Sequence, residues 1–403
     1  MKRLVLITVV LCLAGVFGFA EGQAEAGDEA GPIKVGMMFP RSGSLGLMGE
    51  ESLTGGLEAI EQINARGGIN GRMIEPYVAD VKDTSAAQTE TNRLIQQEGV
   101  KILFGTYGSA LSSVMTSVAN RNGAYYMEVI SVADGITDRD LDGIYRLHFK
   151  GSIMGESAIN FAAWLADKEG IAYEDCRVAA FYENSDFGMS TGEGMVKRAE
   201  ELGMEVVAND SYSKDVPDTS PMVLQAKDRD ANFMVLTPYI NDGINFVRSS
   251  KNLDYNPDAF IGLGTGFALP VFWETLGQDA QGMFDVDPLV TPYWDTMMPS
   301  MIEPYEEFEE MHMEATGHKP VVVSMLTWQA VWLVMNEVVA KVDDPSDLDQ
   351  LIEATEALDL PMGSLPTGHG VKFDSTGQNE RPQIGGMQWQ NGELLPVYPE
   401  AAA

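Results

Sequence analysis

The residue types that carry most enzymatic chemistry are scarce in this chain. A serine nucleophile needs a histidine base beside it, but none of the four histidines, His148, His312, His318 and His369, accompanies a nucleophile-elbow serine motif. The phosphate-binding loop Gly-x4-Gly-Lys-Ser/Thr and the zinc-binding pattern His-Glu-x-x-His are also absent from the sequence. The sequence therefore predicts no catalytic residue, no metal ligand and no cofactor.

Acidic side chains in loops offer binding chemistry instead. Glu128, Glu183, Asp186 and Asp242 each follow a strand-like segment. A carboxylate in such a loop can pair with the ammonium group of a small ligand. The alternative for each of them is a solvated loop acid, since Asp and Glu together number 60 in this chain.

Two further motifs resemble known loops but lack a required position. Residues 262–267 look faintly like a dinucleotide-binding loop, yet their last glycine comes one place early and Pro270 interrupts the helix that would follow. Residues 138–143 begin like a calcium loop, but Phe149 occupies the place of its bidentate acid. We expect a glycine-rich turn that a ligand can approach closely at the first motif and a solvated acidic turn at the second.

Alternating strand and helix patterns would position these loops. The first half has strand patterns at 33–39, 73–79, 102–104, 125–127 and 145–149, with helices between them, and after the helix 153–168 the pattern restarts at 177–182, 205–210, 233–236 and 260–262. Long amphipathic helices follow at 300–314 and 324–341. The fold class predicted is α/β, with two doubly wound parallel-sheet lobes. In such sheets ligands bind outside the carboxyl ends of the strands.

The N-terminus has the three parts of a secretory signal peptide. A basic head, Met1-Lys2-Arg3, precedes an apolar run to Ala20 and then small and acidic residues. We predict a cleaved signal peptide at 1–20; the alternative is an uncleaved membrane anchor. Cys12 fits a lipoprotein signal poorly, and no later stretch is expected to be long and apolar enough to span a membrane. Cys176 would then stand alone, without an intrachain disulfide.

Length and charge set further bounds. With 403 residues the chain is long enough for two domains. Its formal net charge of −34 would repel a phosphate backbone, so we expect no nucleic-acid partner.

Several motifs, in their order and spacing, resemble those of one family. They are Gly36…Pro40-x-Ser42-Gly43, Gly67-Gly68-Ile69-Asn70-Gly71-Arg72, Glu183-Asn184-Ser185-Asp186-Phe187-Gly188 and Gly370-Val371-Lys372-Phe373-Asp374. Together they resemble the ABC-transporter solute-binding proteins of the branched-chain-amino-acid type, which are type I periplasmic binding proteins. The resemblance covers nearly all of the chain after the predicted signal peptide.

The resemblance implies two lobes joined by a three-strand hinge. Lobe 1 would comprise residues 32–150 and 288–371, and lobe 2 residues 151–287 and 372–400, with crossovers near Phe149, Asp287 and Lys372. The place of the acid that pairs the ligand ammonium falls at Gly264 or Thr265, so Glu128 or Asp242 would have to replace it. The candidate ligand-binding residues are Ser42, Tyr107, Ser109, Glu128, Ile130, Ser131, Phe187, Tyr239, Asp242 and Thr265.

The function that the resemblance implies is capture of a small, amino-acid-like solute for an ABC permease at the inner membrane. Such a protein would be periplasmic, monomeric and not an enzyme. Three alternatives stay open at this point. The first is a ligand-sensing receptor domain of the same fold. The second is a binding protein for a carboxylate or amide that is not an amino acid, and the third is an exported α/β enzyme, which the missing catalytic residues disfavour.

Overall fold

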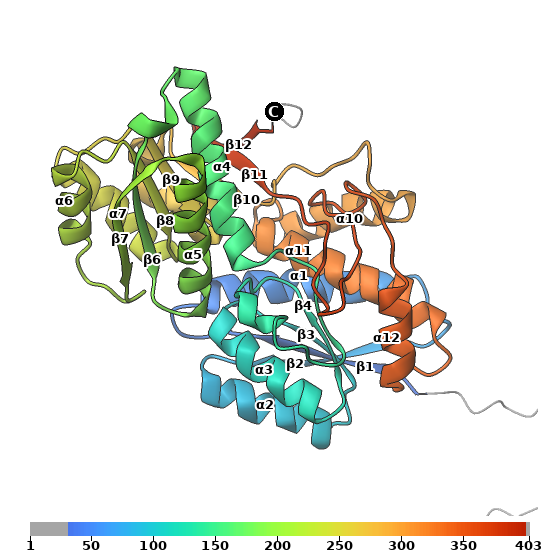
Figure 1. Cartoon of the computed structure of the whole chain (residues 1–403). Coiled ribbons are helices and arrows are strands. Elements are labelled where there is room, and N and C mark those ends of the chain that lie inside the picture. The colour runs from blue at the N-terminus through green and yellow to red at the C-terminus, as the bar shows by residue number, and fades with distance from the viewer. Residues whose placement is uncertain (1–30, 400–403) are drawn as a thin grey trace, which may run out of the picture. The chain divides into compact units, whose positions relative to one another are not determined.

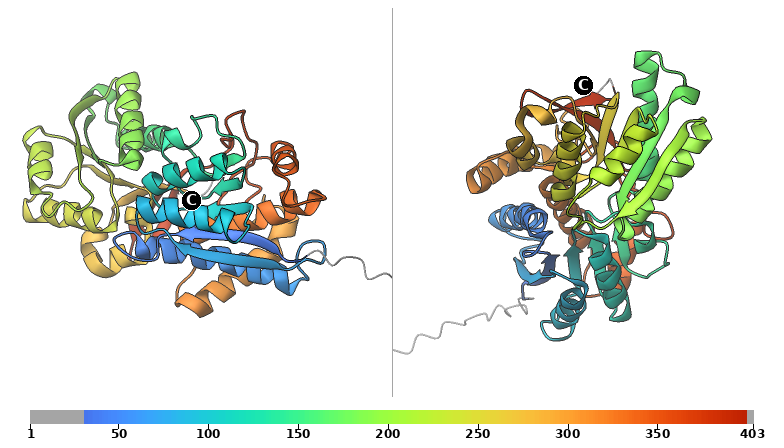
Figure 2. Two further views of the ribbon diagram at one scale, coloured as in Figure 1. Left: turned by 90° about the horizontal axis from the view of Figure 1, so that it is seen from below. Right: turned by 90° about the vertical axis from the view of Figure 1, so that its left-hand side faces the viewer.

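Two β-sheets organise residues 31–399, the part of the chain that the structure, a computed structural model, describes (Figure 1). We call the elements built on the first sheet lobe 1 and those built on the second lobe 2; the right-hand view of Figure 2 shows them as separate groups. The predicted α/β fold with two lobes is confirmed. The predicted signal peptide, residues 1–20, lies outside the described residues and stays a prediction.

The first sheet is parallel and buried on both faces. Its strand order is β2-β1-β3-β4-β5. Successive side chains of a strand point to opposite faces, so Met37 of β1 enters one hydrophobic core and Met38 the other. The strands are β1 (Ile33–Phe39), β2 (Ile74–Asp80), β3 (Ile102–Gly105), β4 (Tyr125–Glu128) and β5 (Ile144–Arg146).

Helices of lobe 1 cover both faces of this sheet. One core contains residues of α1, α10 and α11, and the other contains residues of α2 and α3. α1 and α11 approach closely because Gly55 has no side chain: a Cβ there would lie 2.3 Å from the Ser324 carbonyl oxygen. The helices are α1 (Gly46–Ala65), α2 (Thr84–Gln96), α3 (Ser109–Arg121), α10 (Pro299–Thr316), α11 (Val322–Leu333) and α12 (Leu348–Glu356).

The segment Val322–Lys341 corrects one expectation. It is long and apolar enough to cross a membrane, the one such segment among the described residues, although we expected none after the N-terminus. However, 89% of its apolar window is buried inside the protein, as in a core helix. The helix predicted at 324–341 is also not continuous, because α11 passes into a π-helical turn, Val334–Val338, and a 3₁₀ turn, Val339–Lys341.

The second sheet repeats the topology of the first and extends it. Its order is β12-β11-β10-β9-β8-β6-β7, in which β6 to β10 follow the same parallel arrangement as β1 to β5. The sheet departs from the parallel pattern at one edge, where β11 pairs antiparallel with β10 and with β12. The strands are β6 (Arg177–Glu183), β7 (Glu205–Tyr212), β8 (Phe233–Thr237), β9 (Ala259–Leu263), β10 (Phe284–Asp287), β11 (Gly385–Gln390) and β12 (Glu393–Tyr398).

Lobe 2 has its own two helical layers. Residues of α4 and α5 form one core with the second sheet, and residues of α6, α7 and α9 form another. The sequence patterns missed α6, whose only buried residues are Val223 and Ala226, because so short a buried stripe leaves little periodicity. The helices are α4 (Gly151–Glu169), α5 (Asp186–Leu202), α6 (Ser220–Asp228), α7 (Ile240–Asn252), α8 (Thr265–Ala268) and α9 (Pro270–Leu276).

Two of the connecting segments between the lobes are bonded side by side. The buried guanidinium of Arg146, at the end of β5, donates to the Gln378 side chain at 2.6 Å and to the Ala133 carbonyl at 2.7 Å. Asn379 donates to the Leu147 carbonyl at 2.9 Å. These bonds fix where the chain passes from one lobe to the other, while the lobe boundaries given above stay predictions.

Gly155 provides a test of the packing between α4 and α5. A Cβ at Gly155 would lie 2.0 Å from the Thr191 carbonyl oxygen, which is too close for any rotamer to relieve. We expect Gly155→Ala to destabilise lobe 2 by about 1–3 kcal/mol, measured as a lower urea midpoint. Gly135→Ala is the control, since nothing lies within 4 Å of its added Cβ. Equal midpoints for the two variants would contradict this account of the packing.

Candidate ligand-binding site

A cavity lies where the carboxyl ends of strands from both lobes meet. Its empty space is about 430 Å³, including open solvent at its mouth, and about 40 Å³ of it can hold the centre of a water molecule. The smaller figure is the one comparable with cavity volumes, and it exceeds the roughly 10–15 Å³ that a single water molecule needs. The lining residues are Tyr107, Gly108, Ser109, Ile130, Ser131, Val132, His148, Met154, Phe187, Tyr239, Gly264, Asp287, Val322, Val323 and Leu326.

Six of the ten predicted residues line this cavity, three (Ser42, Glu128 and Asp242) do not, and the side chain of Thr265 is not among those that the structure describes. The six come from loops after β3, β4, β6 and β8, as expected for ligands bound at the carboxyl ends of parallel strands. Their contact with a ligand stays a prediction. The six are Tyr107, Ser109, Ile130, Ser131, Phe187 and Tyr239.

Glu128 lies behind the cavity and supports its wall. Its Oε1 atom accepts hydrogen bonds from the backbone N–H groups of Thr106 at 2.9 Å, Ile130 at 3.0 Å and Ser131 at 2.8 Å, and Oε2 accepts from the hydroxyl of Ser112. The side chain is fully buried and does not line the cavity. This geometry argues against Glu128 as the partner of a ligand ammonium, because its oxygens already accept from the protein.

The same bonds occupy donors of Ile130 and Ser131, two of the candidate ligand-binding residues. Their backbone N–H groups donate to Glu128, and the Ser131 hydroxyl donates to the Thr106 carbonyl at 2.7 Å. These donors therefore face into the protein. The next residue, Val132, also lines the cavity, and its N–H has no acceptor among the described residues.

Asp242 does not line the cavity either. It lies in the first turn of α7 and accepts hydrogen bonds from the Tyr212 hydroxyl at 2.8 Å and the Tyr239 N–H at 3.2 Å. Burial raises its pKa to about 7, although both hydrogen bonds act in the opposite direction. Asp242 thus positions Tyr239 at the cavity wall. We had expected Asp242 itself to contact the ligand.

Ser42 and Thr265 are the other two predicted residues outside the set of six. Ser42 lies on the exposed loop after β1, where its hydroxyl donates to Asp80 at 2.9 Å, and it does not line the cavity. The side chain of Thr265 lies outside what the structure describes. Its neighbour Gly264 does line the cavity, at the end of β9.

Asp287 is the acid that the sequence patterns missed. It ends β10 beside Gly264, since Val286 pairs with Leu263 in the parallel register. Its side chain lines the cavity and is buried, and Oδ2 has no hydrogen-bond partner among the described residues. Burial raises the pKa of Asp287 well above the usual value. The resemblance places an acid at Gly264 or Thr265, after β9. Asp287 lies beside that position, at the end of the neighbouring strand β10.

A second buried carboxyl group accompanies it. Asp285, two residues earlier on the same face of β10, is fully buried, and neither of its oxygens has a partner among the described residues. Burial and the nearby charge of Asp287 raise the pKa of Asp285 well above the usual value. Asp285 does not line the cavity. The alternation Asp285-Val286-Asp287 in an apolar strand is the signal that could have revealed this feature.

His148 was also missed, and its neighbours determine its tautomer. The Gln383 N–H donates to His369 Nδ1 at 3.1 Å, so a neutral His369 carries its proton on Nε2. That nitrogen lies 3.3 Å from His148 Nδ1, which must then accept. Burial lowers the pKa of His369 to about 3 and that of His148 well below its usual value, so both rings are neutral at pH 7. His148 thus carries its proton on Nε2 at the cavity wall.

The remaining wall is apolar and aromatic. Tyr239 packs between Tyr107 and Phe187, with ring centroids 6.0 and 5.7 Å apart. Val322 and Leu326 at the start of α11 complete the apolar lining together with other residues of α4 and α11. The cavity therefore has polar groups at few points and an apolar surface between them.

Comparisons with known proteins agree with this architecture. The family described as "Periplasmic binding protein" matches residues 32–393. Leu/Ile/Val-binding protein homolog 7 of Brucella suis is 33% identical over 404 residues, covering 100% of this chain and 98% of the relative. Homolog 8 of Brucella abortus is 33% identical over 92% of this chain and 91% of its own length.

Solved structures agree on the fold. The branched-chain amino acid transporter substrate binding protein LivJ of Streptococcus pneumoniae, in complex with isoleucine, has a TM-score of 0.76 at 22% identity, covering 91% of this chain and 100% of its own. A solute binding protein of an ABC transporter from R. palustris, in complex with benzoate, has a TM-score of 0.74 at 19% identity, covering 91% of this chain and 96% of its own.

The fold and the cavity define a two-lobe solute-binding protein, not an enzyme. The chain belongs to the periplasmic binding protein family, which implies a place outside the cytoplasm. The named relatives are binding proteins, which does not favour the sensory-receptor alternative.

Glu128 provides a test of how the cavity wall is held. Glu128→Ala removes the acceptor of three backbone N–H groups, and we expect a loss of about 3–5 kcal/mol in stability and faster amide exchange at Ile130 and Ser131. Glu128→Gln keeps an oxygen acceptor and should retain most of the protection. Urea unfolding and amide hydrogen exchange measure both effects.

The pH dependence separates the two variants further. Burial raises the pKa of Glu128 from 4.5 to about 7 in the folded protein, despite opposing hydrogen bonds. The wild type therefore loses stability as pH rises from about 4.5 to 7, because ionising the buried carboxyl group costs free energy. Glu128→Gln removes this slope and gains stability relative to wild type between pH 5 and 8. If Glu128→Gln were as unstable as Glu128→Ala at pH 5 and at pH 8, the hydrogen bonds to Glu128 would not be what holds the cavity wall.

Proposed function

We propose that this protein captures an L-amino acid with an apolar side chain and delivers it to an ABC permease. The observation that carries the ligand class is the cavity itself, which has apolar walls, hydrogen-bond donors at one end and the buried, unpartnered carboxyl group of Asp287. The relatives named Leu/Ile/Val-binding protein homologs and the neighbour in complex with isoleucine support the same class.

The ligand carboxylate would lie at the N-terminus of α3. N–H groups in the first turn of a helix have no acceptor within the helix, and Gly108 at the N-cap provides no side-chain acceptor. Ser109 Oγ accepts from the Ala133 N–H at 3.1 Å, which leaves its own hydrogen for a ligand. With the Val132 N–H and the His148 Nε2–H, these groups form a set of donors suited to an anion.

The ligand ammonium would pair with Asp287. A carboxyl group buried without a partner costs free energy unless it is neutral or meets a cation. An ammonium group supplies that charge and donates to Oδ2, which lacks a donor in the described residues. Asp287 thereby takes the role that we had expected of Glu128 or Asp242.

The apolar wall would contact the ligand side chain. Phe187, Tyr239, Val322 and Leu326 provide aliphatic and aromatic surface but no fixed polar group for a charged side chain. Leucine, isoleucine and valine match this surface. The benzoate complex of the R. palustris neighbour shows that a carboxylate without an ammonium group is the alternative to test.

Closure of the lobes would couple binding to delivery. Lobe 1 contributes Ser109 and His148 to the cavity, and lobe 2 contributes Tyr239 and Asp287. A ligand favours the closed form only through contacts with both lobes. The lobes also contact each other through a hydrogen bond from the Lys214 ammonium to the Ser44 hydroxyl at 2.9 Å. A permease that recognises the closed form would then accept the loaded protein.

Further parts of the proposal follow from the sequence. We place the protein in the periplasm after cleavage of residues 1–20, as a monomer. Its net charge, −34 for the full chain and −36 once Lys2 and Arg3 are removed, disfavours nucleic acid as a partner. The lobes would comprise residues 32–150 with 288–371 and residues 151–287 with 372–400. Three connecting segments would act as the hinge.

Asp287→Asn is the direct test of the ammonium site. The exchange leaves a ligand ammonium without its counter-charge, and we expect L-leucine to bind about 2–5 kcal/mol more weakly. Because burial raises the pKa of Asp287 and pairing requires its ionised form, binding to the wild type releases a proton. Affinity therefore rises with pH until the pH exceeds that raised pKa. Isothermal titration calorimetry in two buffers with different ionisation enthalpies measures both quantities.

Asp285→Asn is the matched control, because Asp285 is equally buried on the same strand but does not line the cavity. It should keep the affinity of the wild type and its proton release. Proton release that survives in Asp287→Asn, or an equal loss of affinity in the two variants, would exclude Asp287 as the ammonium partner.

A further inference from the structure

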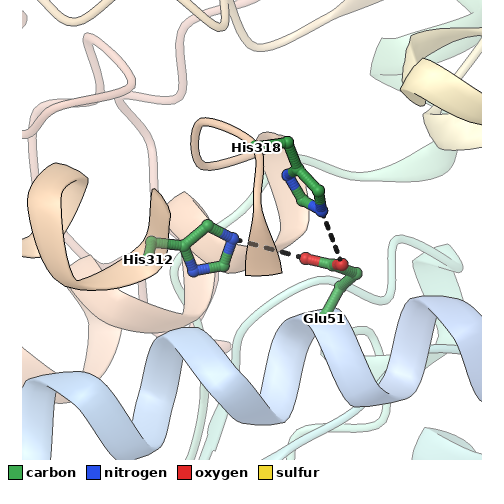
Figure 3. A group of neighbouring side chains, drawn as sticks. All are labelled: Glu51, His312 and His318. Carbon is green, nitrogen blue, oxygen red and sulfur yellow. Dashed lines mark hydrogen bonds and ion pairs between the residues drawn. The ribbon is translucent and has the colours of Figure 1, made fainter. Parts of the chain in front are cut away.

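Three side chains from separate segments of lobe 1 converge away from the cavity. Glu51 of α1, His312 near the end of α10 and His318 just after it meet with their ligand atoms all within 4.8 Å of one another (Figure 3). Gly317 makes this possible, because its positive φ of 84° reverses the chain at the end of α10 and returns His318 toward His312. None of the three residues lines the cavity.

The proton on the His312 ring is fixed by a second acid. His312 Nδ1 lies 2.9 Å from Oε2 of Glu58, which stands two helical turns after Glu51 on the same face of α1. A carboxylate only accepts, so Nδ1 carries the hydrogen. His312 Nε2 then faces Glu51 Oε2 at 3.4 Å. Both of these atoms are buried and have no hydrogen-bond partner among the described residues.

His318 is oriented in the same way. Its Nδ1 atom lies 2.8 Å from the Lys319 carbonyl oxygen, which can only accept, so Nδ1 again carries the hydrogen. Its Nε2 atom faces the other oxygen of Glu51, at 3.2 Å. In the neutral form, both rings thus direct the lone pair of Nε2 at one carboxylate. Because the two lone pairs and the carboxylate oxygens repel one another, either a proton or a metal cation must lie between the rings and Glu51.

We propose that Glu51, His312 and His318 bind one divalent transition-metal ion of the zinc class. Two imidazole nitrogens and a carboxylate are donors that such ions favour, whereas calcium and magnesium prefer oxygen alone. Ligands at zinc distances in a tetrahedron lie about 3.3 Å apart. Each histidine Nε2 lies at a comparable distance, 3.2 or 3.4 Å, from one of the two Glu51 oxygens, and all the ligand atoms lie within 4.8 Å of one another. Glu58 and the Lys319 carbonyl supply the outer-shell acceptors that metal-bound histidines have.

The alternative to a metal ion is a hydrogen-bonded network in which protonated histidines pair with Glu51 and Glu58. Although burial lowers the pKa of His312, hydrogen bonds to Glu51 and Glu58 raise it to about 9, so without metal the ring is protonated at pH 7. Metal and proton then compete for the same nitrogen. The bound ion would connect α1, α10 and the turn that leads into α11, where Val322 and Val323 line the cavity.

The test is a titration of untagged, EDTA-treated full-length protein with Co²⁺ and then with Zn²⁺. We expect one Co²⁺ per chain, with a visible d–d spectrum that Zn²⁺ displaces, and a higher melting temperature on binding. His318→Ala removes a ligand that is only partly buried, so this variant should fold. It should bind Co²⁺ more than about 100-fold more weakly, beyond the 10–100-fold loss typical of outer-shell changes.

Glu51→Gln should weaken binding in the same direction, and Glu61→Gln is its matched control, an exposed glutamate on the same helix. Glu61→Gln should keep the wild-type affinity and spectrum. Absence of Co²⁺ binding in the wild type, or equal binding by the wild type and His318→Ala, would overturn the proposal in favour of the protonated network.

Discussion

The buried carboxyl group of Asp287 is the constraint on which the account of the cavity depends. It is 2% exposed, it lines a cavity whose wall is largely apolar, and its Oδ2 atom receives no hydrogen bond from the described residues. A group in that state is stable only when neutral or when a cation reaches it. The donors at the start of α3 lie along the same cavity, so a zwitterion satisfies both ends at once.

The topology explains why these groups meet. In each lobe the strand order places the carboxyl ends of neighbouring parallel strands at one edge, and the two edges face each other across the cavity. The alternation of apolar strands and helices made this much predictable from the sequence. The first strand, 33–39, was predicted with its observed bounds. The antiparallel strands β11 and β12 were not, since their pairing is decided by contacts distant in the sequence.

The site was predictable only in part, for physical reasons. Loops after strands are visible in a sequence, and the family resemblance singled out Ser109, Phe187 and Tyr239, which line the cavity. Whether an acid in such a loop faces a ligand or the protein depends on its acceptors, and Glu128 and Asp242 are both turned to backbone N–H groups. The tautomer of His148 depends on Gln383, more than two hundred residues away, which no local pattern shows.

The most direct test of the central claim compares two ligands that differ only in the amino group. Protein that has been unfolded, freed of carried-over solute and refolded would be melted with L-leucine and with 4-methylpentanoate. At about a thousand times its dissociation constant, leucine should stabilise the wild type by about 4 kcal/mol, a shift of several degrees. If Asp287 binds the ligand ammonium, leucine gives this shift and the carboxylate gives none. An equal shift with both, or a shift with the carboxylate alone, would contradict an ammonium site at Asp287.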